Sequence, residues 1–340
     1  MYYVARGAGP QGQQGPVCSA RFPGQEWWEA MNSVPLVILA GSDRRPTMLP
    51  SSGRDKHPLS GYKGLDVRIQ GQPLVAAVAE RCLASGCFSP IYLAGPSGIY
   101  KDVTNSVKLI DADGGFAKNV RLAMTAVRAA HPDTPVAFTV CDILPDVDTL
   151  KEVMGDYHRH APCDFYFPLV RTPDDLSQLG PSAWKPVYRV VPESGKAAQR
   201  ILPGHLAVVD PGALRLAFLY RLLQLGYRTR NRSIRYRRGV MVRGVLGALL
   251  YQDLLHLLSL RAPTTAWTVL TAGLKAGRGL KSGTILLAQL EEAIRKIFVT
   301  GQHRKQYPDR QALLPLVEGL SLALDIDTVE EAHAMGGDIE

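Results

Sequence analysis

The chain has 340 residues, of which 46% are hydrophobic and 21% are charged. This balance is typical of a soluble globular protein and excludes a disordered or collagen-like chain. The five cysteines form no CxxC pair, which excludes a zinc ribbon and argues against a disulfide framework, and no signal-peptide-like apolar run opens the chain. We therefore expect a cytoplasmic protein.

The formal net charge of +8 originates in one segment. Between residues 214 and 244 the sequence has no acid and nine arginines, namely Arg215, Arg221, Arg228, Arg230, Arg232, Arg235, Arg237, Arg238 and Arg243. Without these nine charges the net charge would be −1. The basic character, and with it the choice of anionic partners, therefore belongs to this segment and not to the whole chain.

The N-terminal part changes character after a short extension. Residues 1–33 are rich in Gly, Gln and Pro without strand or helix periodicity, which predicts a flexible extension. The continuous apolar run at 34–41 predicts a strand buried on both faces. After a polar loop, the pattern at 71–86 predicts a helix that begins near Pro73 and ends at a left-handed Gly86.

Strands and helices then alternate along the chain. We expect strands at 90–95 and 135–140 and helices at 114–130 and 146–161. Connections from a strand through a helix to a parallel strand are right-handed, so helices cover both faces of the sheet. The alternation therefore predicts an α/β fold with a doubly wound, mostly parallel sheet.

The second half of the chain is less regular. Three more strands are predicted, the last two as a pair, at 164–170, 186–191 and 205–210. A largely helical stretch at about 211–300 is interpreted as an insertion in a domain that spans 34–340. A short strand is predicted at 322–327, and Thr328 with Glu331 forms a capping box for a final helix.

Polar residues follow the predicted strands at the edge where open α/β sheets bind ligands. Asp142 follows the strand at 135–140, and a glycine turn follows the first strand. The last predicted strand carries Asp325 and Asp327. Carboxylate oxygens suit Mg²⁺, and glycine amides with Lys or Arg suit phosphate. The pattern indicates a site for a nucleoside triphosphate with a divalent metal.

Five motifs occur in a particular order: VILAGS, YKGLDVRIQGQPLVAAVAERCLASG, GFAKNVRLAM, FTVCDILP and LALDIDTVEEA. In this combination they resemble the MobA-like nucleotidyltransferases, over roughly residues 34–210 and 320–335. The resemblance implies a GT-A type fold and Mg²⁺ as cofactor. It further implies transfer of a nucleoside monophosphate from a nucleoside triphosphate, with CTP or GTP favoured, to an anionic small-molecule acceptor that offers a phosphate or hydroxyl group, with release of pyrophosphate.

The resemblance also implies roles for single residues. Asp142 and Asp327 match the two aspartates that bind Mg²⁺, and Asp325 competes with Asp327 for this role. Lys63, which precedes the Gly-x-Pro turn at 71–73, matches the lysine that neutralises phosphate. Together with Asp142 it forms the expected catalytic pair.

The resemblance implies two further sets of binding residues. The nucleotide-binding set comprises Ala40, Gly41, Ser42, Arg44, Arg45, Lys63 and Asn119. The acceptor-binding set comprises Gly204 and His205, where the family commonly has Gly-Gly-Asn. The run LAGSDRRP lacks the second glycine of the family's loop after the first strand.

The arginine-rich segment carries a separate expectation. Apolar residues between Val242 and Leu258 fall on one helical stripe, which most often packs into a core. The arginines from Arg228 to Arg243 suit an anionic acceptor or the inner membrane surface, contacted peripherally, and we expect them outside the nucleotide pocket. No recognition module surrounds them, which disfavours nucleic acid.

Two rival functions stay open at the level of sequence. A GT-A type glycosyltransferase that uses a nucleotide sugar would share the fold, but it normally shows Asp-x-Asp after the third strand, where this chain has Asp142, Ile143 and Leu144. A catalytically silent nucleotide-binding or membrane-associated module would keep the fold without turnover. Release of pyrophosphate from a nucleoside triphosphate, compared with and without Mg²⁺, separates an enzyme from a silent binding module.

Overall fold

The computed structural model describes residues 33–42, 46, 48–50, 53–103, 106–232, 234–258 and 263–339. Within α8 (Ile234–Leu258), the side chains of residues 234, 235, 237, 238 and 256 are not described. The predicted extension, apart from residue 33, lies outside the described residues, as do Arg44 and Arg45 of the nucleotide-binding set.

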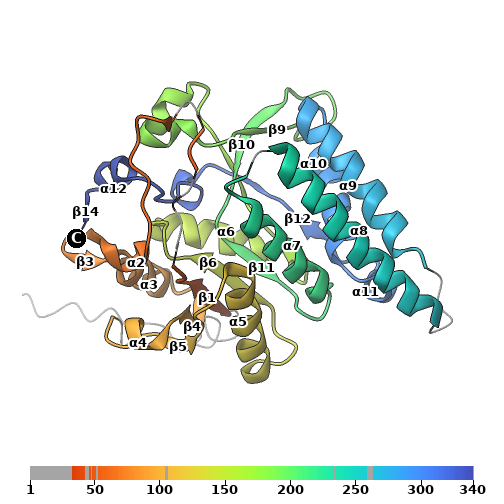
Figure 1. The fold of residues 1–340 in the computed structure, drawn as a ribbon, viewed down its shortest axis with the longest axis horizontal. Helices are drawn as coiled ribbons and strands as arrows, with labels where there is room; N and C mark the ends of the chain where they lie inside the picture. The colour runs from red at the N-terminus through yellow and green to blue at the C-terminus, as the bar shows by residue number, and fades with distance from the viewer. Residues whose placement is uncertain are drawn as a thin grey trace, which may run out of the picture.

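A seven-stranded sheet in the order β12-β7-β11-β6-β1-β4-β5 forms the centre of the molecule (Figure 1). Its strands are β1 (Val34–Leu39), β4 (Phe88–Gly95), β5 (Lys108–Asp111), β6 (Val136–Val140), β7 (Phe165–Tyr166), β11 (Ala207–Val209) and β12 (Ala312–Leu313). Neighbouring strands are parallel except that β11 is antiparallel to β6 and β7. The predicted α/β fold with a mostly parallel sheet is confirmed.

Alternate residues of β1 point into two different cores, because side chains alternate across a strand. Leu36 and Ile38 pack with α3 and α6, whereas Val37 and Leu39 pack with α5 and α7. These helices are α3 (Leu74–Ser85), α5 (Phe116–Ala130), α6 (Val147–His160) and α7 (Leu216–Thr229). As predicted, α3 follows Pro73 and ends at Gly86, whose φ of 68° is left-handed. Helices therefore cover both faces of the sheet.

Two smaller sheets flank the central one, and they correct one predicted pairing. The four-stranded sheet has the order β13 (Leu316–Val317), β8 (Leu169–Arg171), β10 (Gln199–Pro203) and β9 (Tyr188–Val190). The other joins β14 (Gly337–Ile339), β2 (Val67–Ile69) and β3 (Gln72–Pro73). The expected pairing of 186–191 with 205–210 is wrong. Val208 and Val209 of β11 each face one of the two cores, so β11 requires a place inside the central sheet.

The strand predicted at 322–327 is also absent from the described structure. Residues 320–322 form a 3₁₀ turn, η3 (Leu320–Leu322), and the extended residues that follow join no sheet. Single hydrogen bonds hold them instead: the Ile326 amide donates to the Asp142 carbonyl (2.7 Å), and the Leu59 amide donates to the Asp327 carbonyl (2.8 Å). The final helix, α12 (Val329–Ala334), begins with the predicted capping box of Thr328 and Glu331.

The stretch at about 211–300 is helical, as expected. It contains α7, α8, α9 (Thr265–Ser282) and α10 (Leu287–Phe298), and α11 (Gly301–Gln306) follows. The short elements not yet named are α2 (Lys63–Asp66), α4 (Ser97–Tyr100) and η2 (Leu176–Trp184). No helix among the described residues has the length and apolar content to cross a membrane. In Figure 1, α8 and α9 lie side by side at the periphery, away from the central sheet.

The predicted apolar stripe of α8 is only partly a core element. Leu249 is fully buried, whereas Val242 and Leu250 are 58% and 54% exposed and Leu258 is 74% exposed. The periodicity identified the helix, but α7 and α9 cover only one side of it. The expectation that the whole stripe packs into a core is therefore wrong.

A buried ion cluster joins the helical insertion to the central sheet. Asp164, which is fully buried before β7, accepts from Arg295 Nε of α10 (3.1 Å) and lies 3.0 Å from His303 Nε2. We expect Asp164→Ala to lower the free energy of unfolding by about 3–5 kcal/mol, because the buried Arg295 charge would lose its carboxylate partner and keep only hydrogen bonds to the Tyr307 and Pro308 carbonyls. Urea unfolding measures this. Glu292→Ala on α10, which breaks only a surface pair with Lys296, should cost under about 1 kcal/mol; equal losses would contradict the assignment.

Candidate active site

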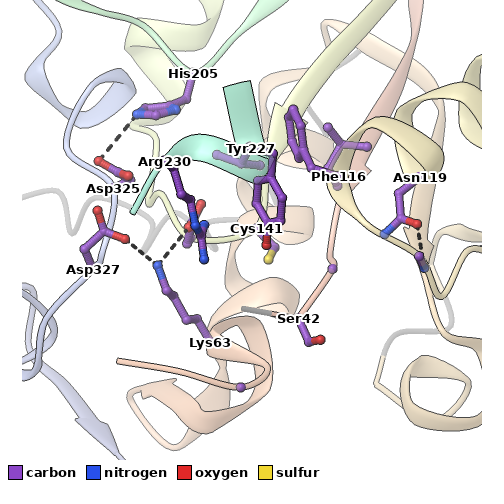
Figure 2. A pocket seen from close by; sticks show the side chains of 16 residues that line it. Ser42, Lys63, Phe116, Asn119, Cys141, His205, Tyr227, Arg230, Asp325 and Asp327 are labelled. Carbon is purple, nitrogen blue, oxygen red and sulfur yellow. Dashed lines mark hydrogen bonds and ion pairs between the residues drawn. The ribbon is translucent and has the colours of Figure 1, made fainter. Parts of the chain in front are cut away.

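A cavity of about 360 Å³ lies at the carboxyl edge of the central sheet, beyond β1 and β6 (Figure 2). Most members of the predicted site line it, namely Gly41, Ser42, Lys63, Asn119, Asp142, His205, Asp325 and Asp327. These residues come from six separate parts of the chain. The fold therefore brings together what the sequence presents as separate motifs.

Three carboxylates meet in this cavity. Asp142, Asp325 and Asp327 each offer an oxygen, and these oxygens lie within 4.8 Å of one another. The hydrogen bond from the Ile326 amide to the Asp142 carbonyl fixes the two aspartate-bearing segments side by side. Hard oxygen donors in this arrangement suit a divalent cation such as Mg²⁺. Asp325 and Asp327, the two candidates for the second metal-binding aspartate, thus both lie beside Asp142.

Among the residues that the structure describes, Lys63 is the cation closest to two of these carboxylates. It begins α2 and is 5% exposed. Its Nζ lies 2.5 Å from Asp327 Oδ1 and 3.6 Å from Asp142 Oδ2. The next residue, Gly64, packs directly against Cys141, where an added Cβ would come within 3.0 Å of the sulfur. This close approach of α2 to the end of β6 places the lysine in the site.

A second buried lysine, Lys185, was not predicted. It is 7% exposed, and its Nζ lies 2.6 Å from Asp325 Oδ1, 3.3 Å from Glu331 Oε1 and 3.8 Å from Asp327 Oδ2. The only sequence signal was a lone lysine between Trp184 and a proline. Lys185 forms ion pairs with both Asp325 and Asp327 and with Glu331, the capping residue of α12. These ion pairs hold the two aspartates in place.

Burial and charge act against each other in the site. Burial raises the pKa of Asp142, and the Lys63 ammonium only partly offsets this. Burial also acts to raise the pKa of Asp325, but His205 and Lys185 outweigh it and hold that pKa well below the usual range. For Lys185, burial lowers the pKa and the surrounding carboxylates raise it, with a net increase. Asp325 and Lys185 therefore form a charged pair.

The side of the cavity opposite Asp325 is built around Asn119 (Figure 2). Asn119 is 3% exposed, and its Oδ1 accepts from the Gly114 amide (2.9 Å). Gly41 packs against the Asn119 side-chain amide, since a Cβ added at position 41 would lie 3.1 Å from Asn119 Nδ2. Ala40 does not line the cavity; it is fully buried, and its amide donates to the Ala94 carbonyl (2.9 Å).

The predicted acceptor residues lie on the side of the aspartates. His205 Nε2 is 3.5 Å from Asp325 Oδ1, and the His205 amide donates to the Leu322 carbonyl (2.7 Å). Gly204 is buried outside the cavity lining, and its amide donates to the Pro168 carbonyl (3.0 Å). A Cβ at position 204 would lie 2.7 Å from that carbonyl oxygen, so only glycine fits. Gly204 positions His205 and does not face the cavity itself.

The arginine-rich segment reaches the cavity, which corrects our expectation. Arg230, just beyond α7, lines it and stacks over the Tyr227 ring at 4.3 Å. Helix α7 packs against α5, and Tyr227 stacks on Phe116 at the start of α5, with centroids 6.0 Å apart. This packing carries the end of α7 over the cavity. The expectation that the cluster lies wholly outside the pocket is therefore wrong.

A second, larger cavity of about 790 Å³ adjoins the first and shares Ser42, Gly114, Tyr227 and Arg230 with it. Arg228 and Arg232 also line it. Asn231 ties this region to the loop after β1, because its Nδ2 donates to the Pro46 carbonyl (2.8 Å) and its Oδ1 accepts from the Met48 amide (3.1 Å). Asn231, in the helical stretch at 211–300, thus contacts the loop after β1, for which the sequence predicts a role in nucleotide binding.

The α/β fold with its mostly parallel central sheet has counterparts among solved structures. A solved structure of a hypothetical transferase from Thermus thermophilus superposes with a TM-score of 0.50, over 88% of this chain and 99% of that chain, at 16% sequence identity. A 4-diphosphocytidyl-2C-methyl-D-erythritol synthase from Anaerococcus prevotii gives a TM-score of 0.40 over 89% of this chain and 96% of that chain, at 7% identity. No protein-family model matches the chain, and no curated protein matches it.

Proposed function

We propose that this protein is a Mg²⁺-dependent nucleotidyltransferase of the MobA-like type. It would transfer a nucleoside monophosphate from a nucleoside triphosphate, CTP or GTP by resemblance, to an anionic small-molecule acceptor. The observation that carries the proposal is the meeting of Asp142, Asp325 and Asp327 beside a cavity lined by Gly41 and Ser42. The transferase fold and the order of the sequence motifs support it.

The residues present fit a hard divalent cation. Three carboxylates supply oxygen donors at close range, and two buried lysines, Lys63 and Lys185, offset only part of their charge, which leaves net negative charge for a cation. Asp142, Asp325 and Asp327 would hold the ion. Mg²⁺ bound there would supply positive charge to the α-phosphate of the nucleotide and to the departing pyrophosphate.

The chain's own residues divide between the two substrates. Lys63 and Arg230 face the same cavity and would offset the negative charge of the triphosphate. Gly41 and Asn119 would accommodate the nucleoside, because a glycine without Cβ lets the backbone approach the base closely. On the opposite side, His205 would contact the acceptor.

The proposed step is an in-line displacement at the α-phosphorus. An acceptor oxygen forms a new bond to this phosphorus, the bond to the β-phosphate bridging oxygen breaks, and that oxygen leaves with the electron pair as part of pyrophosphate. Lys185 does not touch the reacting atoms in this arrangement. It is a positioning residue, because it holds Asp325 and Asp327 through its own ion pairs.

Thermal unfolding with each of the four nucleoside triphosphates tests the nucleotide part of the proposal. A ligand that binds the native state raises its melting temperature. We expect at least one triphosphate to do so in the presence of Mg²⁺ and to lose most of this effect with EDTA. Stabilisation by a nucleotide sugar but by no triphosphate would favour a glycosyltransferase, and stabilisation by neither class would contradict nucleotide binding.

Arg230→Gln tests the role of the insertion in nucleotide binding. Removal of a charged hydrogen-bond donor from the triphosphate should weaken binding about tenfold to 100-fold. Isothermal titration with the triphosphate that stabilises the wild type gives the Kd. Arg221→Gln is the matched control, since Arg221 is exposed on α7 and donates only to Gln224 among the contacts described. An unchanged Kd in Arg230→Gln would remove Arg230 from the nucleotide site.

A further inference from the structure

Large apolar side chains are exposed at the far end of the helical pair α8–α9. Six of them define what we call the apolar tip, namely Leu250, Leu254, Leu255, Leu257 and Leu258 of α8 and Trp267 of α9. Each is at least 43% exposed, and Leu258 and Trp267 are each 74% exposed. Single exposed leucines are ordinary on protein surfaces, but a contiguous group of this kind marks an interaction surface.

The helix geometry shows that the tip is one continuous surface. At 100° per residue, the buried residues Leu249 and Asp253 lie within about 40° of each other, and the five leucines of the tip follow at about 80° to 240° from Leu249, over the exposed part of the helix surface. A surface helix normally has polar residues on this side. The end of α8 instead carries apolar residues on both its buried side and its exposed side. This pattern is typical of a helix whose exposed side also contacts an apolar environment.

The hairpin that carries the tip is strongly cationic. Residues 234–282 contain eight Lys or Arg and a single acid, Asp253. Asp253 is 7% exposed, and its two carboxylate oxygens accept from the Thr265 and Ala266 amides at 2.9 and 2.8 Å. The one acid therefore caps the start of α9 and closes the hairpin, and it does not offset the surface charge. Arg243, Lys275, Arg278 and Lys281 are all exposed.

We propose that the apolar tip inserts into the interfacial region of an anionic phospholipid surface, with the basic residues of α8 and α9 contacting the lipid phosphates. Apolar burial combined with attraction to anionic lipid is how amphipathic helices bind membranes. A second copy of this chain would bring the same positive charge to the contact, which disfavours self-association through this face. The proposal is independent of the proposed reaction.

The tip lies at the other end of α8 from the site. Arg232, at the start of this helical pair, lines the second cavity, whereas Leu258 ends α8. Val240 is the described residue of α8 nearest the tip that lines this cavity, and Leu254 lies 14 residues further along the helix, at about 21 Å, so substitutions at Leu254 and Leu258 do not touch either cavity. The melting temperature of each variant serves as the folding control, so the test does not depend on nucleotide binding.

Co-sedimentation of the full chain with vesicles tests the proposal. We compare phosphatidylcholine vesicles with vesicles in which about one third of the lipid is phosphatidylglycerol. The wild type should bind the anionic vesicles more strongly, and Leu254→Ser with Leu258→Ser should weaken this binding about tenfold or more, because two partly buried leucines are lost. The matched control, Leu83→Ser with Ile99→Ser, alters two exposed apolar residues elsewhere and should bind like the wild type.

Two further measurements keep the proposal falsifiable. The tryptophan emission of the wild type should shift to the blue on binding, and Trp267→Phe should remove this shift. Lys275→Gln with Arg278→Gln should weaken binding to anionic vesicles at low salt. Equal vesicle binding by the tip variant and the wild type would overturn the proposal. A wild-type dimer that forms without lipid and disappears in the tip variant would overturn it as well, because the tip would then face a second copy.

Discussion

Asp142→Asn should lower Mg²⁺-dependent pyrophosphate release by about 10³-fold, with little change in the melting temperature of the metal-free protein. The amide keeps the shape of the side chain but loses the charge that a hard cation requires. Asp142 also lies 3.6 Å from Lys63, and its carbonyl accepts a hydrogen bond from the Ile326 amide in the segment that carries Asp325 and Asp327, so it contacts both other parts of the proposed metal site.

The matched control for this substitution is Asp146→Asn. Asp146 lies four residues further along the same loop, but its side chain is 63% exposed and pairs at 3.6 Å with Arg81 outside the cavity. Turnover should stay within about twofold of the wild type. The same exchange at Asp325 and at Asp327 shows whether one or both complete the metal site. Near-normal turnover of Asp142→Asn would remove this residue from the metal site.

Lys185→Met should lower the free energy of unfolding by about 3–5 kcal/mol in the absence of divalent metal. The substitution leaves Asp325, Asp327 and the buried Glu331 without their shared cation. Added Mg²⁺ should restore part of this loss, because a bound cation would replace the missing charge among the same carboxylates. The stabilisation by Mg²⁺ should therefore be larger in the variant than in the wild type.

Urea unfolding with and without Mg²⁺ measures both effects. Lys196→Met is the control, since Lys196 is exposed in the turn between β9 and β10. It should change stability by less than about 0.5 kcal/mol and leave the response to Mg²⁺ unaltered. If Lys185→Met were equally harmless, the ion pairs of Lys185 would not hold the carboxylates together.

Local signals in the sequence predicted the larger elements of the first half of the fold. The strands β1, β4 and β6 and the helices α3, α5 and α6 each carry their own periodicity, whereas the edge strand β5 and the short elements α2, β2, β3 and α4 were not predicted. Gly86 marks the end of α3, and the Thr328–Glu331 capping box marks the start of α12, both through local backbone chemistry. Asp142 was also identifiable, because the residue after a parallel strand lies at the ligand-binding edge whatever the rest of the chain does.

Features that depend on distant packing could not be predicted in the same way. The strand β10 and the true partner of β9 follow from the central position of β11, which no local pattern encodes. Lys185 acquires its role only because the segment after η2 packs against α12. Arg230 was noticed as a charge, but its place over the cavity follows from the packing of α7 on α5.

The most direct test of the central claim is transfer of the labelled α-phosphate from each nucleoside triphosphate to a pool of sugar, polyol and cofactor phosphates. We expect a labelled nucleotidyl product and equimolar pyrophosphate for at least one triphosphate, with Mg²⁺ required and the product lost in Asp142→Asn. No product and no pyrophosphate from any triphosphate, under conditions in which a nucleotide sugar donates its sugar, would contradict it.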